Sequence, residues 1–261
     1  MITSLQNPAI KNIAKLSKSR ERRGQHLFVI EGARELSLAL QSGYRVESVY
    51  VCRELFNKTK YPGVLHGLPD TALSDISPEV FGKIAYRENS DGIVALAIPK
   101  SHRPADLRLS GNPFIILLET VEKPGNLGAV LRTADAALVD AVIICDPQTD
   151  LYNPNVIRSS VGGLFTVQTA VCTSEEAFAW LQAHKIAVYA AEPEGAEFYQ
   201  DIDFRQPSAI VMGTEAEGLT DFWLRNATKR IRIPMRGKID SLNVSVSTAV
   251  ITFEAMRQRG F

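Results

Sequence analysis

Two polar residues, Ser241 and Asn243, flank Leu242 in a segment that follows a strand-like run. Residues 233–246 read IPMRGKIDSLNVSV, which we interpret as a strand end, a polar turn and the start of a helix. Backbone N–H groups are unpaired at such a junction, and α/β proteins bind ligands there. An ordinary connection in which Ser241 or Asn243 caps the helix fits the same pattern. The segment therefore predicts a helix cap, a binding site, or both.

Two further segments in the C-terminal half carry polar side chains beside glycines. EKPGNLGAVLRTADAA places Asn126 and Arg132 six residues apart near the start of a predicted helix. In MGTEAEGLTDFW, Gly213 ends a strand-like run and Glu215 follows it. Glycines let the backbone approach a ligand closely, and a carboxylate can pair with an arginine or favour a helix N-terminus. Each segment alone also fits a simpler structure: a helix with one surface arginine, or a solvated acidic turn.

The elements that must position these segments alternate between apolar strands and helices, which predicts a parallel sheet covered on both faces. The strand-like runs are residues 114–119, 141–145, 164–171, 187–191, 209–213 and 230–235. The helical patterns between most of them are residues 126–139, 153–161, 174–184 and 243–258. In the last helix, one apolar face consists of Val246, Ala249, Val250 and Phe253.

The N-terminal part has a different pattern. Residues 1–25 carry a net charge of +5, contributed by Lys11, Lys15, Lys18, Arg20, Arg22 and Arg23 against Glu21. Such a basic arm can bind a phosphate backbone, but a solvated helix face has the same composition. Strands are expected at 26–32, 46–52 and 92–99, with helices at 33–43 and within 71–87. We therefore expect four parts: a basic helical arm (1–25), a compact α/β domain (26–99), a linker (100–112) and a larger domain (113–261).

Composition limits the possible functions. The formal net charge of the 261 residues is zero, which does not suit a broadly basic nucleic-acid binder. No G-x-G-x-x-G follows the first strand and no P-loop motif occurs, so an ordinary dinucleotide or P-loop site is not expected. Three cysteines in apolar surroundings and four scattered histidines predict reduced thiols and no metal site. No apolar run is long enough for a membrane helix and no signal peptide is recognised, so we expect a cytoplasmic protein.

In this order, the three polar segments resemble the motifs of the SpoU (TrmH) family of RNA ribose 2′-O-methyltransferases, in the SPOUT superfamily. N-L-G-A-V-L-R-T-A-D resembles the first motif, M-G-x-E-x-x-G-L the second, and I-P-M-x-G-x-x-x-S-L-N-V-S-V the third. The resemblance covers about residues 113–258. Through F-V-I-E-G near residue 30, the N-terminal part is similar to the ribosomal-protein-like RNA-binding domain often fused to these enzymes.

The resemblance implies an α/β fold whose parallel sheet, flanked by helices, ends in a deep C-terminal trefoil knot, with a small N-terminal α/β domain. It implies S-adenosylmethionine as the methyl donor and a homodimer with the active site near the subunit interface. The residues implied to contact the donor are Gly213, Ile233 and Leu242, with Ala191 and Glu192 as a looser match. The positions implied to matter for activity are Asn126, Arg132, Glu215, Ser241 and Asn243.

Methyl transfer from a sulfonium requires the ribose 2′-hydroxyl to be aligned and deprotonated. The three motifs contain no histidine or cysteine, and arginine stays protonated in proteins. Our hypothesis is that Arg132 stabilises the developing 2′-alkoxide and grips the adjacent phosphate, while the proton leaves to that phosphate or to water. Asn126 and Glu215 would hold Arg132 in place. Ser241 or Asn243 would orient the ribose or phosphate.

We expect large-subunit (23S) ribosomal RNA as the substrate, because the family's transfer-RNA enzymes often lack the accessory N-terminal domain. The alternatives are a transfer-RNA ribose 2′-O-methyltransferase and a non-catalytic RNA-binding or ribosome-assembly protein. Overall neutrality shifts the expected RNA contacts to the basic arm and the N-terminal domain.

Overall fold

The computed structural model describes residues 1–57, 60–87 and 90–260, which form two compact units. The first unit contains residues 1–100 and 151–166, and the second contains residues 101–150 and 167–261. No helix in these described ranges is long and apolar enough to cross a membrane.

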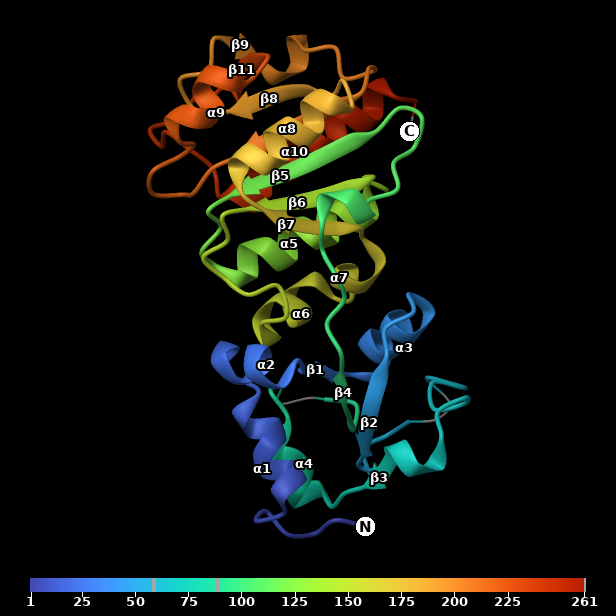
Figure 1. The fold of residues 1–261 in the computed structure, drawn as a ribbon. Coiled ribbons are helices and arrows are strands. Elements are labelled where there is room, and N and C mark those ends of the chain that lie inside the picture. Colours follow the sequence, from blue (N-terminus) through green and yellow to red (C-terminus); the bar gives the residue numbers. More distant parts are fainter. Residues whose placement is uncertain (58–59, 88–89, 261) are drawn as a thin grey trace. The chain divides into compact units, whose positions relative to one another are not determined.

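The first unit has a four-stranded sheet in the order β1-β4-β2-β3 (Figure 1). β4 is antiparallel to both β1 and β2, while β3 is parallel to β2. Its elements are α1 (Pro8–Lys15), α2 (Ser19–Gln25), β1 (Phe28–Glu31), α3 (Ala33–Gln41), β2 (Val46–Val51), η1 (Asp70–Ala72), β3 (Leu73–Asp75), α4 (Pro78–Ile84), β4 (Ile93–Ala97), α6 (Pro154–Ser160) and α7 (Gly163–Thr166). Ile10 and Ile13 of α1 share a core with Val80 and Phe81 of α4, so the basic segment is folded against the sheet domain.

Residues 151–166 pack with the N-terminal elements, whereas the predicted ranges placed them in the larger domain. Aromatic side chains account for this packing. The Tyr152 ring lies 4.2 Å from that of Phe28, and the Phe165 ring lies 5.2 Å from that of Tyr44. Burying four large rings together is favourable enough to hold a distant segment of chain.

The second unit has a seven-stranded sheet in the order β7-β6-β5-β10-β8-β11-β9, in which every pair is parallel. Its elements are η2 (Pro104–Asp106), β5 (Phe114–Glu119), α5 (Pro124–Ala136), β6 (Ala141–Cys145), β7 (Thr169–Cys172), α8 (Ser174–Ala183), β8 (Ala187–Ala191), β9 (Glu197–Phe198), η3 (Tyr199–Asp201), β10 (Ser208–Met212), α9 (Asp221–Asn226), β11 (Lys229–Arg232) and α10 (Val244–Gln258). Ile115 and Leu117 of β5 pack against Leu181 of α8 and Trp223 of α9. The parallel sheet flanked by helices confirms the predicted fold class.

One local prediction for this half of the chain is wrong. The strand expected at 164–171 is instead helix α7 followed by β7, because Phe165 belongs to the aromatic cluster of the first unit. In α10 the apolar face noted in the sequence is partly exposed, since Val246 and Phe253 are 47% and 40% exposed. The buried residues of α10 are Thr248, Ile251, Thr252, Ala255 and Met256. The hydroxyl of Thr248 donates to the Val244 carbonyl at 2.7 Å, so this polar side chain is satisfied inside the protein.

Candidate active site

A cleft of about 490 Å³ lies at the carboxyl ends of β8, β10 and β11, beside the start of α10. The arrowheads of β5 and β8 in Figure 1 point toward this edge of the sheet. Ligands of open parallel sheets bind at the carboxyl ends of strands, and this volume lies within the roughly 300–1,000 Å³ of small-molecule sites. The walls are formed by residues 191–193, 212–218, 231–233 and 240–244, together with Met235, Ser247 and Ile251.

A tight loop after β10 forms one wall of this cleft. Thr214 pairs with Gly218, whose N–H donates to the Thr214 carbonyl at 3.2 Å. The two glycine backbones are so close that a Cβ on Gly213 would lie 2.1 Å from the carbonyl carbon of Gly218. Only glycine fits at position 213, and its absent side chain lets the loop fold back and present Glu215.

Glu215 stands at the centre of a polar network that joins all three motif segments. The Asn126 amide, at the start of α5, donates to the Glu215 carboxylate at 3.0 Å. Asn243 donates to the same carboxylate and lies 3.2 Å from the Asn126 amide oxygen. Lys123 forms an ion pair with the other carboxylate oxygen. Lys123 first, and then Asn126, lower the pKa of Glu215 below its usual value, so its carboxylate stays anionic at neutral pH.

Asn243 has a second role as the N-cap of α10. Its amide oxygen accepts from the backbone N–H of Ser245 at 3.0 Å, while its amide nitrogen reaches Asn126 and Glu215. The helix cap and the polar network therefore share one side chain. Ser241 lines the cleft but does not cap the helix, since its hydroxyl donates to Asp240 at 3.3 Å.

Arg132 lies outside this network. It follows Asn126 by six residues on α5, which places it about 120° around the helix and roughly 9 Å further along it. Its side chain is exposed and, among the described residues, has no hydrogen-bond or ion-pair partner. The predicted contacts from Asn126 and Glu215 to Arg132 are thus not seen, and Lys123 takes that place instead. Lys123 was not among the residues predicted from the sequence; its position directly before Pro124, at the start of the helix, was the available signal.

The five residues implied to hold a methyl donor all line the one cleft: Ala191, Glu192, Gly213, Ile233 and Leu242. Two buried polar atoms there suit a ligand with hydroxyl and amino groups. Glu192 Oε1 and Arg232 Nε make no hydrogen bond within the described chain, and Glu192 Oε1 has only a long ion pair, at 3.4 Å, with Arg230. Buried polar atoms are normally hydrogen-bonded. These two atoms therefore leave hydrogen-bonding capacity for the polar groups of a methyl donor.

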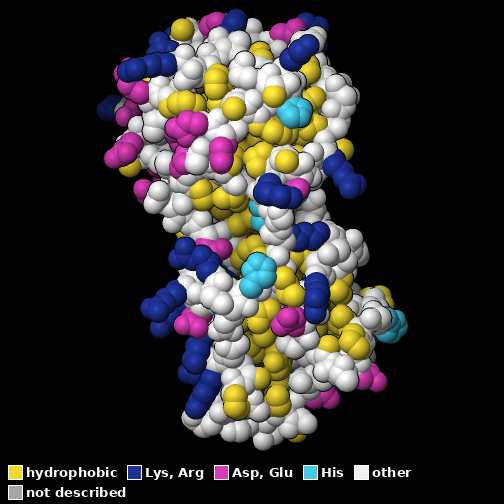
Figure 2. Space-filling model, in the orientation of Figure 1, with side chains coloured by type: hydrophobic (Ala, Val, Ile, Leu, Met, Phe, Trp, Pro, Cys, Tyr) yellow, Lys and Arg dark blue, Asp and Glu magenta, His cyan; other side chains and the backbone are white. Residues whose placement is uncertain are grey.

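The basic segment of the first unit is only partly available to RNA. Figure 2 shows Lys and Arg side chains along the edge formed by α1 and α2. The exposed members of the predicted set are Lys11, Lys15, Lys18, Arg20 and Arg23. Arg22 is a correction: it is 3% exposed, and its guanidinium donates to the Leu16 and Ser17 carbonyls at 2.8 Å each. Its role is to join α1 to α2, because those carbonyls at the end of α1 need donors.

Among the described residues, no group of three or more His, Cys, Asp or Glu side chains is arranged to hold a metal ion.

Comparison with known proteins finds a matching family model for each of the two parts of the chain. Residues 7–95 match the MRM3-like substrate binding domain. A 23S rRNA (guanosine(2553)-2′-O)-methyltransferase of Bacillus subtilis is 29% identical, with 97% of each chain covered. A crystal structure of an RNA 2′-O ribose methyltransferase has a TM-score of 0.87 and 41% identity, covering 100% of this chain and 99% of that one. The AdoMet-bound rRNA methyltransferase of Sinorhizobium meliloti has a TM-score of 0.88 and 28% identity, covering 98% and 97%. Residues 113–253, more than half of the sequence, match the SpoU rRNA Methylase family, and the chain belongs to that family.

Proposed function

We propose that this protein transfers a methyl group from S-adenosylmethionine to a ribose 2′-hydroxyl of 23S ribosomal RNA. The observation that carries the proposal is the meeting of the three motif segments beside one cleft. Glu215 and Asn243 line the cleft, and Asn126 joins them in a single hydrogen-bonded group. The relatives support the reaction class, since the Bacillus subtilis protein is a 23S rRNA 2′-O-methyltransferase by name. The Sinorhizobium meliloti structure supports the donor.

When bound, S-adenosylmethionine supplies a methyl group already activated by the positive sulfur. Gly213, Ile233 and Leu242 would hold it, mainly through backbone groups and apolar contact, and Glu192 would accept from its polar groups. No side chain fits at Gly213 without moving the loop, so its backbone borders the cleft directly. The loop after β10 and the segment before α10, which both line the cleft, would hold the donor from two sides.

The chain's own residues must then position the ribose and assist removal of the 2′-hydroxyl proton. Glu215 is a poor proton acceptor, because its two oxygens already accept from Lys123, Asn126 and Asn243 and its pKa is lowered. Its role is to keep the two asparagines in fixed orientations, which preorganises the site. Ser241, an exposed residue that lines the cleft, would orient the ribose or a phosphate.

Arg132 would grip the phosphate next to the target ribose and stabilise the developing alkoxide, with the proton leaving to that phosphate or to water. Its exposed, unpartnered guanidinium supports a contact with substrate, since no protein group occupies its donors in the described chain. Arg132→Lys tests this role. Loss of methyl transfer at every pH supports a forked donor, whereas substantial activity at raised pH would indicate a base.

A homodimer is part of the proposal. Val246 and Phe253 leave an apolar strip of α10 47% and 40% exposed. Apolar area of this kind is favourable to bury against a second copy, and a two-fold axis would pair the strip with itself. Val246→Glu should shift the sedimentation of the protein toward the monomer; an unchanged dimer would exclude this surface as the interface.

Two further parts of the proposal concern chain path and location. We take the segment before α10 to pass through a loop of the sheet as a trefoil knot. The packing of α10 back onto α5 and the wall that residues 240–244 add to the cleft support this path. We place the reaction in the cytoplasm, because the proposed substrate is ribosomal RNA.

Methyl incorporation from labelled donor into total RNA tests the function directly. Label in the large ribosomal RNA supports the proposal, and label in transfer RNA would replace it with the alternative substrate. Donor binding and RNA binding without any label would instead indicate a non-catalytic RNA-binding protein. Mapping 2′-O-methyl positions with and without the protein then identifies the nucleotide.

A further inference from the structure

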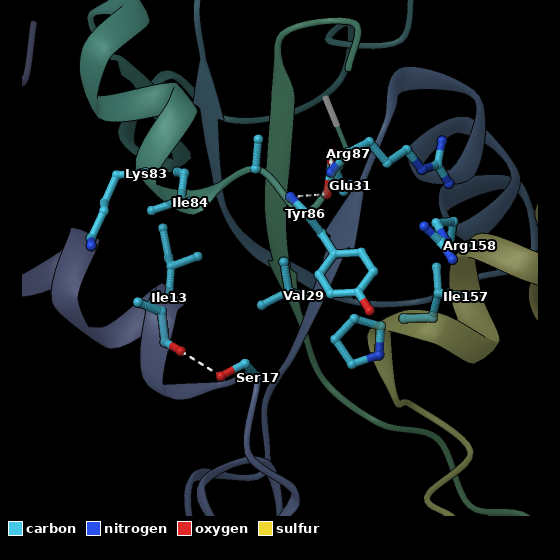
Figure 3. Close-up of a pocket in the computed structure, with 13 residues that line it drawn as sticks. Ile13, Ser17, Val29, Glu31, Lys83, Ile84, Tyr86, Arg87, Ile157 and Arg158 are labelled. Atoms are coloured by element: carbon cyan, nitrogen blue, oxygen red, sulfur yellow. Dashed lines mark hydrogen bonds between the residues drawn. The ribbon is translucent and has the colours of Figure 1, made fainter. Parts of the chain in front are cut away.

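The first unit contains a second, smaller pocket that has no part in the methyl-transfer site. It has a volume of about 190 Å³ and lies among α1, β1, α4 and α6 (Figure 3). Its floor is apolar and consists of Ile13, Val29, Ile84 and Ile157. The volume is below the roughly 300 Å³ at which sites for whole cofactors begin, so the pocket suits a single small planar group.

An exposed tyrosine is held rigidly at this pocket. The side chain of Tyr86 is 51% exposed, yet its backbone N–H donates to the Glu31 carboxylate at 2.7 Å, and the next residue, Arg87, donates to the same carboxylate at 3.1 Å. Glu31 is itself 7% exposed. A buried carboxylate thus fixes the backbone that carries an exposed aromatic ring. Figure 3 shows that ring in the middle of the pocket.

The surroundings of Tyr86 suit a nucleotide. The Arg158 guanidinium lies 5.4 Å from the ring centroid, within range of a cation–π contact, and among the described residues no second aromatic ring stacks on Tyr86. Lys83 lies on the other side of the pocket in Figure 3 and is exposed. Arg87 is paired with Glu35 at 2.6 Å, and Glu31 is occupied by the two backbone N–H groups. Lys83 and Arg158 are therefore the cations available to an anion.

We propose that this pocket takes one unpaired nucleobase of the RNA substrate, stacked on Tyr86, while Lys83 and Arg158 hold the phosphates beside it. Aromatic stacking with flanking cations is how proteins bind single-stranded RNA, whereas bases inside a duplex are already stacked and cannot enter. The inference rests on the proposed function, because it assumes that the substrate is RNA. It assigns the first unit a defined contact with an unpaired nucleotide, separate from the exposed cations of α1 and α2.

The test measures equilibrium binding of the full-length protein to a fluorescein-labelled 12-nucleotide single-stranded RNA by anisotropy. Tyr86→Leu should weaken binding about 5- to 150-fold, the range for losing one stacked base, and Tyr86→Phe should retain it within about twofold. Tyr61→Leu is the matched control, since Tyr61 also has a lysine over its ring, at 5.2 Å, but lies outside the pocket. Lys83→Gln should reduce the slope of log K against log salt by about 0.7.

A blunt 12-base-pair RNA duplex serves as the second probe, and Tyr86→Leu should leave its binding unchanged. Equal loss on both probes, or equal loss in Tyr61→Leu, would overturn the stacking assignment, as would wild-type binding retained in Tyr86→Leu. Methyl incorporation by the wild type is scored separately. If Tyr86→Leu weakens binding but the wild type transfers no methyl group, the stacking pocket stands and the proposed enzymatic function fails. If the wild type transfers methyl groups but Tyr86→Leu binds normally, the proposed function stands and the stacking pocket fails.

Discussion

Replacing Gly213 by alanine tests whether the tight loop after β10 builds the active site. The added Cβ would lie 2.1 Å from the Gly218 carbonyl carbon, 2.2 Å from its oxygen and 2.4 Å from the Leu219 nitrogen. All three are backbone atoms, so no side-chain rotation relieves the clash. Ordinary carbon contacts are about 3.5 Å or longer, and the two strands of the loop must therefore separate by roughly 1 Å.

The size of the effect follows from this displacement. Overpacking a tight site costs about 1–3 kcal/mol, and three backbone clashes place Gly213→Ala at the upper end. For a unit of this size, about 2–3 kcal/mol lowers the melting temperature by roughly 5–10 °C. The same movement shifts Glu215, which the loop carries, and a displacement of about 1 Å at a catalytic group costs on the order of 100-fold in rate.

Three measurements on the full-length protein check this reasoning: thermal unfolding, calorimetric titration with S-adenosylmethionine, and methyl transfer to ribosomal RNA. Gly125→Ala is the matched control, because it lies in α5 and its added Cβ would meet nothing within 4 Å. Alanine is favoured over glycine within a helix, so this variant should be as stable as the wild type or slightly more so. If Gly213→Ala melted, bound donor and turned over like Gly125→Ala, the close approach of the two glycines would not matter and the reasoning would be refuted.

The remaining predictions concern the polar network and the basic segment. Asn243→Ser should retain the helix cap and the melting temperature but lose methyl transfer, since serine is too short to reach Asn126 and Glu215. Asn243→Ala should also lose about 1 kcal/mol of stability, because it removes the cap. Equal melting temperatures of the two variants would contradict the role of Asn243 in both the cap and the network. The ratio of wild-type to Glu215→Gln activity should stay constant from about pH 6 to pH 9. The pKa of Glu215 is lowered from its ordinary value of 4.5, so the carboxylate is charged above pH 4.5 and its contribution is lost only as the pH falls below that value. A ratio that changes near neutrality would show that Glu215 titrates there. Arg22→Gln should lower the melting temperature, because it removes buried charge-assisted hydrogen bonds. Arg23→Gln should weaken RNA binding and leave the melting temperature unchanged. Thermal unfolding and RNA titration of both variants measure this contrast.

Much of the second unit could be predicted from periodicity. The runs at 114–119, 141–145 and 187–191 coincide with β5, β6 and β8, because strands buried on both faces are continuously apolar. The same rule misassigned the apolar run at 164–171, where part of the chain packs into an aromatic cluster far away in sequence. An apolar run shows that residues are buried, but it does not show which elements bury them.

In the candidate site, too, the sequence predicted which residues take part but not how their side chains pair. Residue types and spacing singled out Asn126, Gly213, Glu215 and Asn243. The last three line one cleft, and Asn126 is hydrogen-bonded to Glu215 and Asn243. The sequence left open whether Ser241 or Asn243 caps the last helix, and it paired Glu215 with Arg132 rather than Lys123. Both questions depend on where a side chain points after three distant loops have packed together, and local sequence does not encode that direction.

The sequence by itself determined the order of the elements, the parallel sheet, and which polar residues stand at strand ends, because these follow from local periodicity and residue type. Only the tertiary structure decided that Arg22 is buried, that Lys123 neutralises Glu215, and that one apolar face of α10 remains exposed. The physical reason is that burial and pairing are properties of contacts between segments far apart in the chain. Such contacts form only when the whole fold is in place.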